Sequence, residues 1–199
     1  MNFHNTRVCL FIILLLILST TAAFGCSVKE DGYIPGKFGV SDLSIYDTQS
    51  KKSISYGMTK EEVEKILGQS DGKSQTVPNS FSYGNCSILY RDNKLVLITL
   101  NSDESFKEER FVTNRGTKLG DKPENIIDKY GDATTNIPND ITFYFQKSSF
   151  NLMLVKEEDL VSFSKDSTDV YLIDFYTNGT NNTISSIYIG DSRAFSTFK

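Results

Sequence analysis

The 199-residue chain contains no tryptophan, a single histidine and only three cysteines. The histidine, His4, precedes an apolar run in what we interpret as a cleaved leader, so the mature chain is expected to lack histidine. That absence excludes Ser-His-Asp and Cys-His catalysis, histidine-ligated zinc and histidine proton shuttles. The sequence also contains no glycine-rich phosphate loop and no calcium-loop spacing of acidic residues. It therefore predicts no enzyme active site of these kinds, no cofactor and no metal.

Blocks of positive charge are missing as well. The chain has 21 Lys and Arg against 25 Asp and Glu, and removal of Arg7 with the leader leaves 20 against 25. A nucleic-acid-binding surface requires clustered Lys and Arg, so no nucleic-acid partner is expected. The modest negative charge is spread along the chain, which is typical of a solvated surface.

The N-terminus has the three regions of a secretory signal peptide. Residues 1–7 are a short polar start with one fixed positive charge, and residues 8–18 are almost unbroken hydrocarbon. Ala22-Ala23-Phe24-Gly25-Cys26 then resembles the lipobox of bacterial lipoproteins, whose peptidase cleaves before a cysteine that carries diacylglycerol. The resemblance implies cleavage between Gly25 and Cys26, with Cys26 as the lipid attachment site and an N-acyl chain such as palmitate added afterwards.

Two other interpretations of this segment stay open. The first is a transmembrane helix, although such a helix needs about 20 apolar residues and this run is shorter. Ordinary secretion with a free Cys26 is the second, because Phe24 stands where lipoboxes carry a smaller residue. No later stretch is long or apolar enough to hold a membrane, so an N-terminal lipid would be the only anchor. We expect an extracytoplasmic protein that is lipid-anchored to a bacterial cell membrane.

Two helix signatures recur at an offset of 63 residues, in 56–68 and 119–131. In the first, Thr59 and Glu62 have the spacing of a capping box. In the second, Asp121 is the expected cap and Pro123 falls in the first turn. Each signature contains an apolar stripe and ends at a glycine. The stripes are Val63, Ile66 and Leu67 in the first copy and Ile126, Ile127 and Tyr130 in the second.

Short segments of alternating apolar and polar residues follow each helix, which is typical of antiparallel hairpins. The expected strands are 80–83, 87–91, 94–100, 141–146, 150–155, 171–176 and 184–189, with turns at Asp92-Asn93 and Asn178-Gly179. A helix followed by an antiparallel sheet, twice, predicts an α+β fold of two tandem units, each with a short helix packed on its sheet. Because a unit of about 60 residues buries little core, the two should pack together or continue one sheet.

The expected organisation has four parts: a lipoprotein signal peptide (1–25), a lipidated tether (26–50), and two helix-sheet repeats (51–112 and 113–199). The tether contains several glycines and little periodicity, and would hold the folded part off the membrane. Within the second repeat, residues 157–163 are expected to form a helical turn in an otherwise irregular loop.

The pattern Gly57-Met58-Thr59-x-x-x-Val63-x-x-Ile66-Leu67-Gly68 is similar to the helix signature of SmpA/OmlA lipoproteins, partners of the outer-membrane β-barrel assembly machinery. The same tandem helix-sheet unit occurs in β-lactamase inhibitor proteins, which grip an enzyme with a concave sheet. The second copy, 119–131, looks like a related repeat of Gram-positive lipoproteins. The resemblance implies a helix-plus-sheet fold that binds a protein partner.

Cys86 and three carboxylate groups are the remaining candidates for chemistry. Cys86 lies in a strand-like run without a neighbouring base or cation, so we expect a small buried residue and no disulfide. The acidic groups are Glu61-Glu62, Glu108-Glu109 and Glu157-Glu158-Asp159. Adjacent carboxylates on a helix point about 100° apart, so they do not match the geometry of glycoside hydrolysis.

These observations favour a non-enzymatic binding or scaffold module for another envelope protein or glycan. Tyr, Ser and Thr on an outward sheet face supply contact area and adaptable hydrogen bonds, and the loop between Val155 and Asp169 is a second candidate surface. An inhibitor of an envelope or secreted enzyme is one alternative. A hydrolase using carboxylates, or Tyr and Lys, is another, and a buried carboxyl pair in a cleft with perturbed acidity would indicate it.

Overall fold

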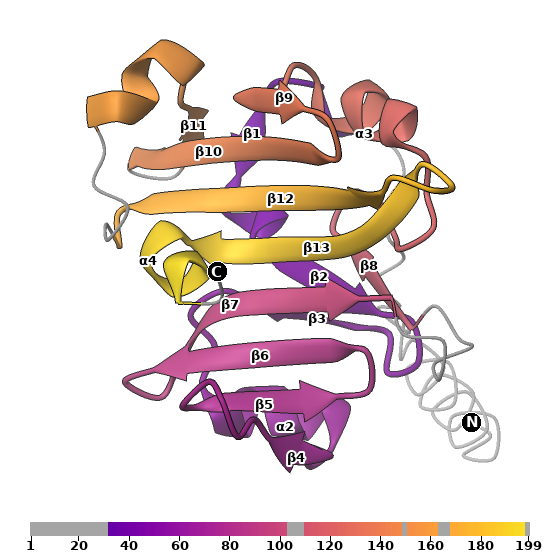
Figure 1. Cartoon of the computed structure of the whole chain (residues 1–199). Coiled ribbons are helices and arrows are strands. Elements are labelled where there is room, and N and C mark those ends of the chain that lie inside the picture. The colour runs from indigo at the N-terminus through magenta and orange to yellow at the C-terminus, as the bar shows by residue number, and fades with distance from the viewer. Residues whose placement is uncertain (1–31, 103–109, 149–150, 163–167, 198–199) are drawn as a thin grey trace, which may run out of the picture.

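Figure 1 shows the computed structural model, which describes residues 32–102, 110–148, 151–162 and 168–197. The predicted signal peptide and the predicted sites at Gly25 and Cys26 lie outside the described residues. None of the helices within the described ranges has the length and apolar character needed to cross a membrane.

Most described residues belong to antiparallel β-structure. The larger sheet has ten strands in the order β1-β11-β10-β12-β13-β7-β6-β5-β4, and β9 also pairs with β10. Its strands are β1 (Phe38–Gly39), β4 (Gly72–Lys73), β5 (Ser80–Tyr83), β6 (Cys86–Arg91), β7 (Lys94–Asn101), β9 (Thr135–Ile137), β10 (Asp140–Ser148), β11 (Asn151–Leu154), β12 (Val170–Asn178) and β13 (Thr183–Asp191). A second sheet, ordered β3-β2-β8, contains β2 (Ser44–Asp47), β3 (Lys52–Ser55) and β8 (Phe111–Thr113).

The predicted α+β fold of two tandem helix-sheet units is wrong. β13, from the second predicted unit, pairs with β7, from the first, with Ile189 opposite Ile98. One antiparallel sheet therefore runs through both units, and the described part contains only three short α-helices: α2 (Lys60–Leu67), α3 (Pro123–Tyr130) and α4 (Ser192–Ser196). Joining the units in this way pairs two strand edges that would otherwise expose unsatisfied backbone groups.

The local helix signals nevertheless predicted α2 and α3 well. The Glu62 amide donates to Thr59 Oγ1 at 3.2 Å and the Thr59 amide to Glu62 Oε2 at 2.7 Å, which confirms the capping box. In α3 the predicted cap at Asp121 is wrong, because the helix begins at Pro123 and Lys122 occupies the cap position. A residue that precedes proline is disfavoured in the helical region, and Lys122 is accordingly extended.

The predicted hairpin strands are all present, with ends that differ by at most two residues. The turn at Asp92-Asn93 joins β6 to β7, and both residues have positive φ, +50° and +57°. Two consecutive positive φ values are those of the tight hairpin turn whose twist matches the flanking strands.

Part of the segment 26–50, predicted as a tether, belongs to the fold in the structure. Residues 38–47 form β1, the 3-10 turn η1 (Val40–Asp42) and β2. The segment is held by tertiary bonds: buried Asp47 accepts hydrogen bonds from Arg110 Nε and Nη2 at 2.8 and 3.1 Å. Even earlier, the Gly36 amide donates to the carbonyl of Tyr130 at 2.8 Å. The chain thus enters the fold within a few residues of Gly32.

The core fills the space between the inner face of the large sheet and the elements behind it. Viewed as in Figure 1, α2 and the small sheet lie behind the large sheet, and α4 lies in front of it. Phe38, Tyr130, Phe143 and Phe175 form a packed aromatic group in this core, with ring centroids 5.2 to 6.3 Å apart.

A buried ion pair lies at the edge of this aromatic group. Arg115 Nε and Nη2 donate to the two carboxylate oxygens of Asp42 at 2.7 and 3.0 Å. The same guanidinium donates to the carbonyls of Lys129 at 2.8 Å and Lys37 at 2.6 Å. Because each of these bonds reaches a different segment, Arg115 ties η1, the end of α3 and the approach to β1 together.

Candidate functional site: the outer face of the large sheet

The outer face of the large sheet carries a polar row that crosses six strands. Strand register places its members opposite one another in sequence: Thr142, Asp174, Tyr188, Thr99, Ser87 and Ser82. The alternate residues of the same strands, among them Phe143, Ile173 and Ile98, are fully buried on the inner face. The period of two along each strand therefore separates an apolar inner face from a polar outer face.

A carboxylate and tyrosine group occupies the β10–β12 end of this row. Thr142 Oγ1 lies 2.7 Å from Asp140 Oδ1 and 2.9 Å from Asp174 Oδ1, so one hydroxyl bridges two carboxyl groups. Burial raises the pKa of the Tyr176 phenol, and the negative charges of Asp174 and Asp140 raise it further. Tyr176 and Tyr188 meet edge to face with centroids 5.7 Å apart. Asp174 is only 1% exposed. The half-buried tyrosines of this group therefore face the solvent, and the carboxylate of Asp174 does not.

A second polar group lies at the end of β13, where α4 begins. Fully buried Asp191 caps α4 by accepting from the Ala194 amide at 2.8 Å. Its other oxygen accepts from Arg91 Nη2 and from the Tyr56 hydroxyl at 2.9 Å. Burial, and then the charge of Asp191, raise the pKa of Tyr56. The carboxylate is saturated by these donors, which indicates that it fixes α4 on the sheet.

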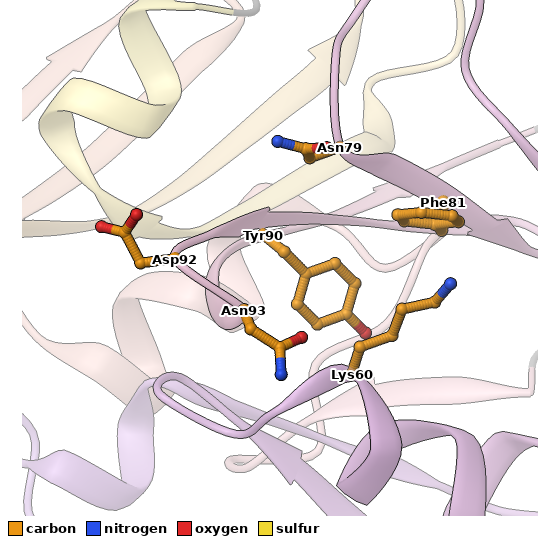
Figure 2. A pocket seen from close by; sticks show the side chains of 6 residues that line it. All are labelled: Lys60, Asn79, Phe81, Tyr90, Asp92 and Asn93. Carbon is orange, nitrogen blue, oxygen red and sulfur yellow. The ribbon is translucent and has the colours of Figure 1, made fainter.

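An open hollow of about 390 Å³ lies near the N-terminus of α2. Figure 2 shows Lys60 reaching from α2 toward Phe81, with the ring of Tyr90 beside them; the lining is completed by Asn79, Asp92 and Asn93. Lys60 Nζ sits 3.7 Å from the Phe81 ring centroid and 3.5 Å from Glu64 Oε1. The one lysine of the hollow thus already has both an aromatic and an acidic neighbour.

The residues singled out in the sequence fall into three groups. Cys86 is fully buried and unpaired as predicted, and burial raises the pKa of its thiol. Glu61 and Glu62 are exposed at the start of α2, and Glu157, Glu158 and Asp159 are exposed on the 3-10 helix η2 (Glu157–Ser162). Glu108, Glu109 and part of the loop between Val155 and Asp169 lie outside the described residues.

Sequence reasoning missed the bridged carboxylates and the Asp191 group. Each depends on residues brought together by strand register from distant positions, such as Arg91 and Asp191. A signal was nevertheless present, because Asp174 interrupts an otherwise apolar run at an outward period-two position. Within the described ranges, no three His, Cys, Asp or Glu side chains converge as metal ligands.

Comparisons with known proteins yield no family. No family model matches the chain, and no curated protein matches it. Among solved structures, an extracellular protein containing an SCP domain from Bacillus anthracis aligns with a TM-score of 0.41 at 9% identity, covering 71% of this chain and 45% of that one. A cysteine-rich secretory protein from Staphylococcus aureus aligns with a TM-score of 0.37 at 11% identity, covering 71% and 44%.

These comparisons correct the resemblance drawn from the helix signature. The structures that align are described as SCP-domain and cysteine-rich secretory proteins, not as SmpA/OmlA lipoproteins or β-lactamase inhibitor proteins. The chain spans less than half the length of either one, and similarity of this degree transfers no activity. The short helix signature, with its caps and stripe, is therefore evidence for a local helix and not for that family.

Proposed function

We propose that this chain is an extracytoplasmic, lipid-anchored binding protein whose outer sheet face engages another protein of the cell envelope. The leader and the lipobox-like Ala22-to-Cys26 segment support the location and the anchor. The observation that carries the binding role is the polar row on a sheet face that α4 covers only in part (Figure 1).

The dimensions of this face fit a protein partner. Six strands spaced about 4.8 Å apart give the row a length of roughly 24 Å. This length is comparable with the width of a square patch of about 800 Å², the area that each partner buries in a standard interface. The half-buried Tyr188, Ser87 and Ser82 of the row provide contact area at low entropic cost together with adaptable hydrogen bonds. A small ligand or sugar unit is instead usually held in a concave pocket, and the hollow at Lys60 and Phe81 lies on other residues. An envelope protein is therefore the favoured partner over a glycan.

The buried carboxylates support binding over hydrolysis. A carboxylate-dependent hydrolase needs a carboxyl pair that can reach a substrate. Asp191 is fully buried with four donors, and Asp174 is almost fully buried beneath neighbouring side chains. Asp191 positions α4 and Asp174 helps to join β10 to β12, so both carboxylates have structural roles that need no substrate chemistry.

Matched arginine substitutions test the proposal in membranes. Ser87→Arg combined with Ser186→Arg places two bulky charges on the outer face, on β6 and β13, which lie on either side of β7. Ser53→Arg, on an exposed position of β3 in the small sheet, is the control. The membrane-anchored protein is crosslinked in cells and purified, and its partner is quantified by mass spectrometry.

We expect one protein to be captured equally by the wild type and by Ser53→Arg, and at least tenfold less by the outer-face double variant. Equal capture by all three proteins would contradict the role of the outer face. Retention on isolated cell-wall glycan that the double variant abolishes would replace the protein partner with a glycan.

A further inference from the structure

The exposed large apolar residues of the described part gather at one edge of the large sheet. They are Tyr33, Ile34, Val40, Ile137 and Met153, and four of them are 46–58% exposed. Ile34 and Val40 flank β1, and Met153 lies on β11, which pairs with β1. Ile137 lies on β9. Figure 1 shows β1, β9 and β11 together at the top of the sheet.

Strand pairing confirms that this is a single edge. β9 pairs with the first part of β10, from Asp140 to Thr142, and β11 pairs with its last part, from Phe145 to Ser148. Both strands therefore lie along the same side of β10. The turn that contains Ile34 lies beside the segment that leads into β9, since the Gly36 amide donates to the carbonyl of Tyr130, five residues before β9 begins. We call this edge, with Ile34, Val40, Ile137 and Met153, the apolar edge.

The same edge is where the chain enters the fold. Gly32 is six residues from Cys26, and a fully extended chain of that length spans at most about 21 Å. Measured along the sheet, the eight strand steps from β1 to β4 extend roughly 38 Å. The chain from Gly32 to a lipid on Cys26 is therefore too short to reach past the opposite edge of the sheet, at β4 and α2. That edge could not rest on the membrane while the lipid is inserted.

We infer that the apolar edge lies against the lipid surface, where its side chains enter the boundary between headgroups and acyl chains. The inference rests on the proposed lipid anchor, which supplies the proximity, while the exposed apolar side chains supply the affinity. The acidic residues of η2 follow β11 directly, so the contact is apolar rather than an attraction to anionic lipid. This placement orients the large sheet upright on the membrane, with its strands stacked away from the lipid surface and its outer face open to the side.

The absence of tryptophan makes the inference directly measurable. Ile34→Trp, Val40→Trp and Met153→Trp each place one reporter on the apolar edge, and Lys73→Trp and Gln75→Trp place one at the opposite edge. The lipidated full-length protein is reconstituted in neutral phosphatidylcholine vesicles with or without brominated acyl chains. Thermal unfolding of each variant shows that the fold is kept.

We expect bromine to quench the three apolar-edge reporters at least threefold more strongly than Lys73→Trp or Gln75→Trp, without dependence on salt. Equally weak quenching at all five positions would overturn the inference. Mass spectrometry of the N-terminal peptide reports separately whether Cys26 carries lipid.

A second arm keeps the two questions apart if Cys26 proves unmodified. The mature chain is then coupled through the Cys26 thiol to a maleimide lipid in the same vesicles, since buried Cys86 is protected from the reagent. Strong quenching at the apolar edge would support the membrane contact even though natural anchoring had failed. Weak quenching in this arm would overturn the contact whatever the natural anchor is.

Discussion

The two faces of the large sheet are built from the same strands but have different roles. Alternate residues of β7, β10, β12 and β13 point inward and are fully buried, while their neighbours form the polar outer row. The inner face packs against α2, α3 and the small sheet in one core, and α4 covers part of the outer face (Figure 1). Stability should therefore depend on inner positions, and the half-buried outer positions Tyr188, Ser87 and Ser82 should be available for recognition. By contrast, Thr142, Asp174 and Thr99 of the same row are at most 3% exposed.

The buried ion pair behind the inner face should give the largest effect. Arg115→Met leaves the carboxylate of Asp42, only 3% exposed, without its partner. Breaking a buried pair in this way costs about 3–5 kcal/mol. We expect the free energy of unfolding in urea to fall by that amount. A matched Arg110→Met should cost less, because Arg110 is 22% exposed against 1% for Arg115 and the amides of Gln49 and Ser50 still donate to Asp47. An equal loss would show that the burial of Arg115 is not what matters.

Two residues of β7 that are three positions apart test the contrast between the faces most simply. Ile98 is fully buried on the inner face, and Asn101 is exposed at the strand end. Ile98→Ala should lower the free energy of unfolding by about 2–4 kcal/mol through lost transfer energy and a cavity. Asn101→Ala should change it by less than about 0.5 kcal/mol. Similar losses at both positions would mean that the face assignment is wrong.

The Asp47–Arg110 pair should make stability depend on acid. Burial alone would raise the pKa of Asp47, but hydrogen bonds from Arg110, Ser50 and Gln49 outweigh it and hold this pKa below the ordinary value of 3.8. The stabilisation by ionised Asp47 is thus complete above about pH 4–5 and is lost as the pH falls through the depressed pKa. Asp47→Asn should destabilise by about 1.5–3 kcal/mol at pH 7.

Urea unfolding of the wild type and Asp47→Asn between pH 7 and pH 2 measures this difference. The gap between the two proteins should shrink below pH 4. A gap that stays constant down to pH 2 would show that packing, rather than charge, makes Asp47 important.

Local signals in the sequence predicted α2, α3 and the long hairpins, because caps, stripes and alternation act over a few residues. The small sheet was missed because its strands are only three or four residues long and partly polar, as in Ser44–Asp47. Those strands form through contacts such as Asp47 with Arg110, 63 positions apart. The joining of the two predicted units through β13 and β7 likewise depends on long-range pairing that no local pattern specifies.

The candidate site was predicted only in kind. Tyr, Ser and Thr on an outward sheet face follow from alternation, but their assembly into one row requires the register of six strands. The bridge from Thr142 to both Asp140 and Asp174 joins β10 to β12 across 32 positions. The apolar edge could not be predicted either, because residues 33–40 have little periodicity and the pairing of Phe38 and Gly39 with β11 is a long-range contact.

Site-specific photocrosslinking in cells tests the central claim that the outer face is the recognition surface. A photoreactive residue replaces Ser87 or Ser186 on the outer face, and Lys65 on α2 or Asn125 on α3 on the opposite side. We predict one discrete adduct to the same protein from both outer positions and none from the two helix positions. Adducts that form from Lys65 and Asn125 but not from Ser87 and Ser186 would contradict the account.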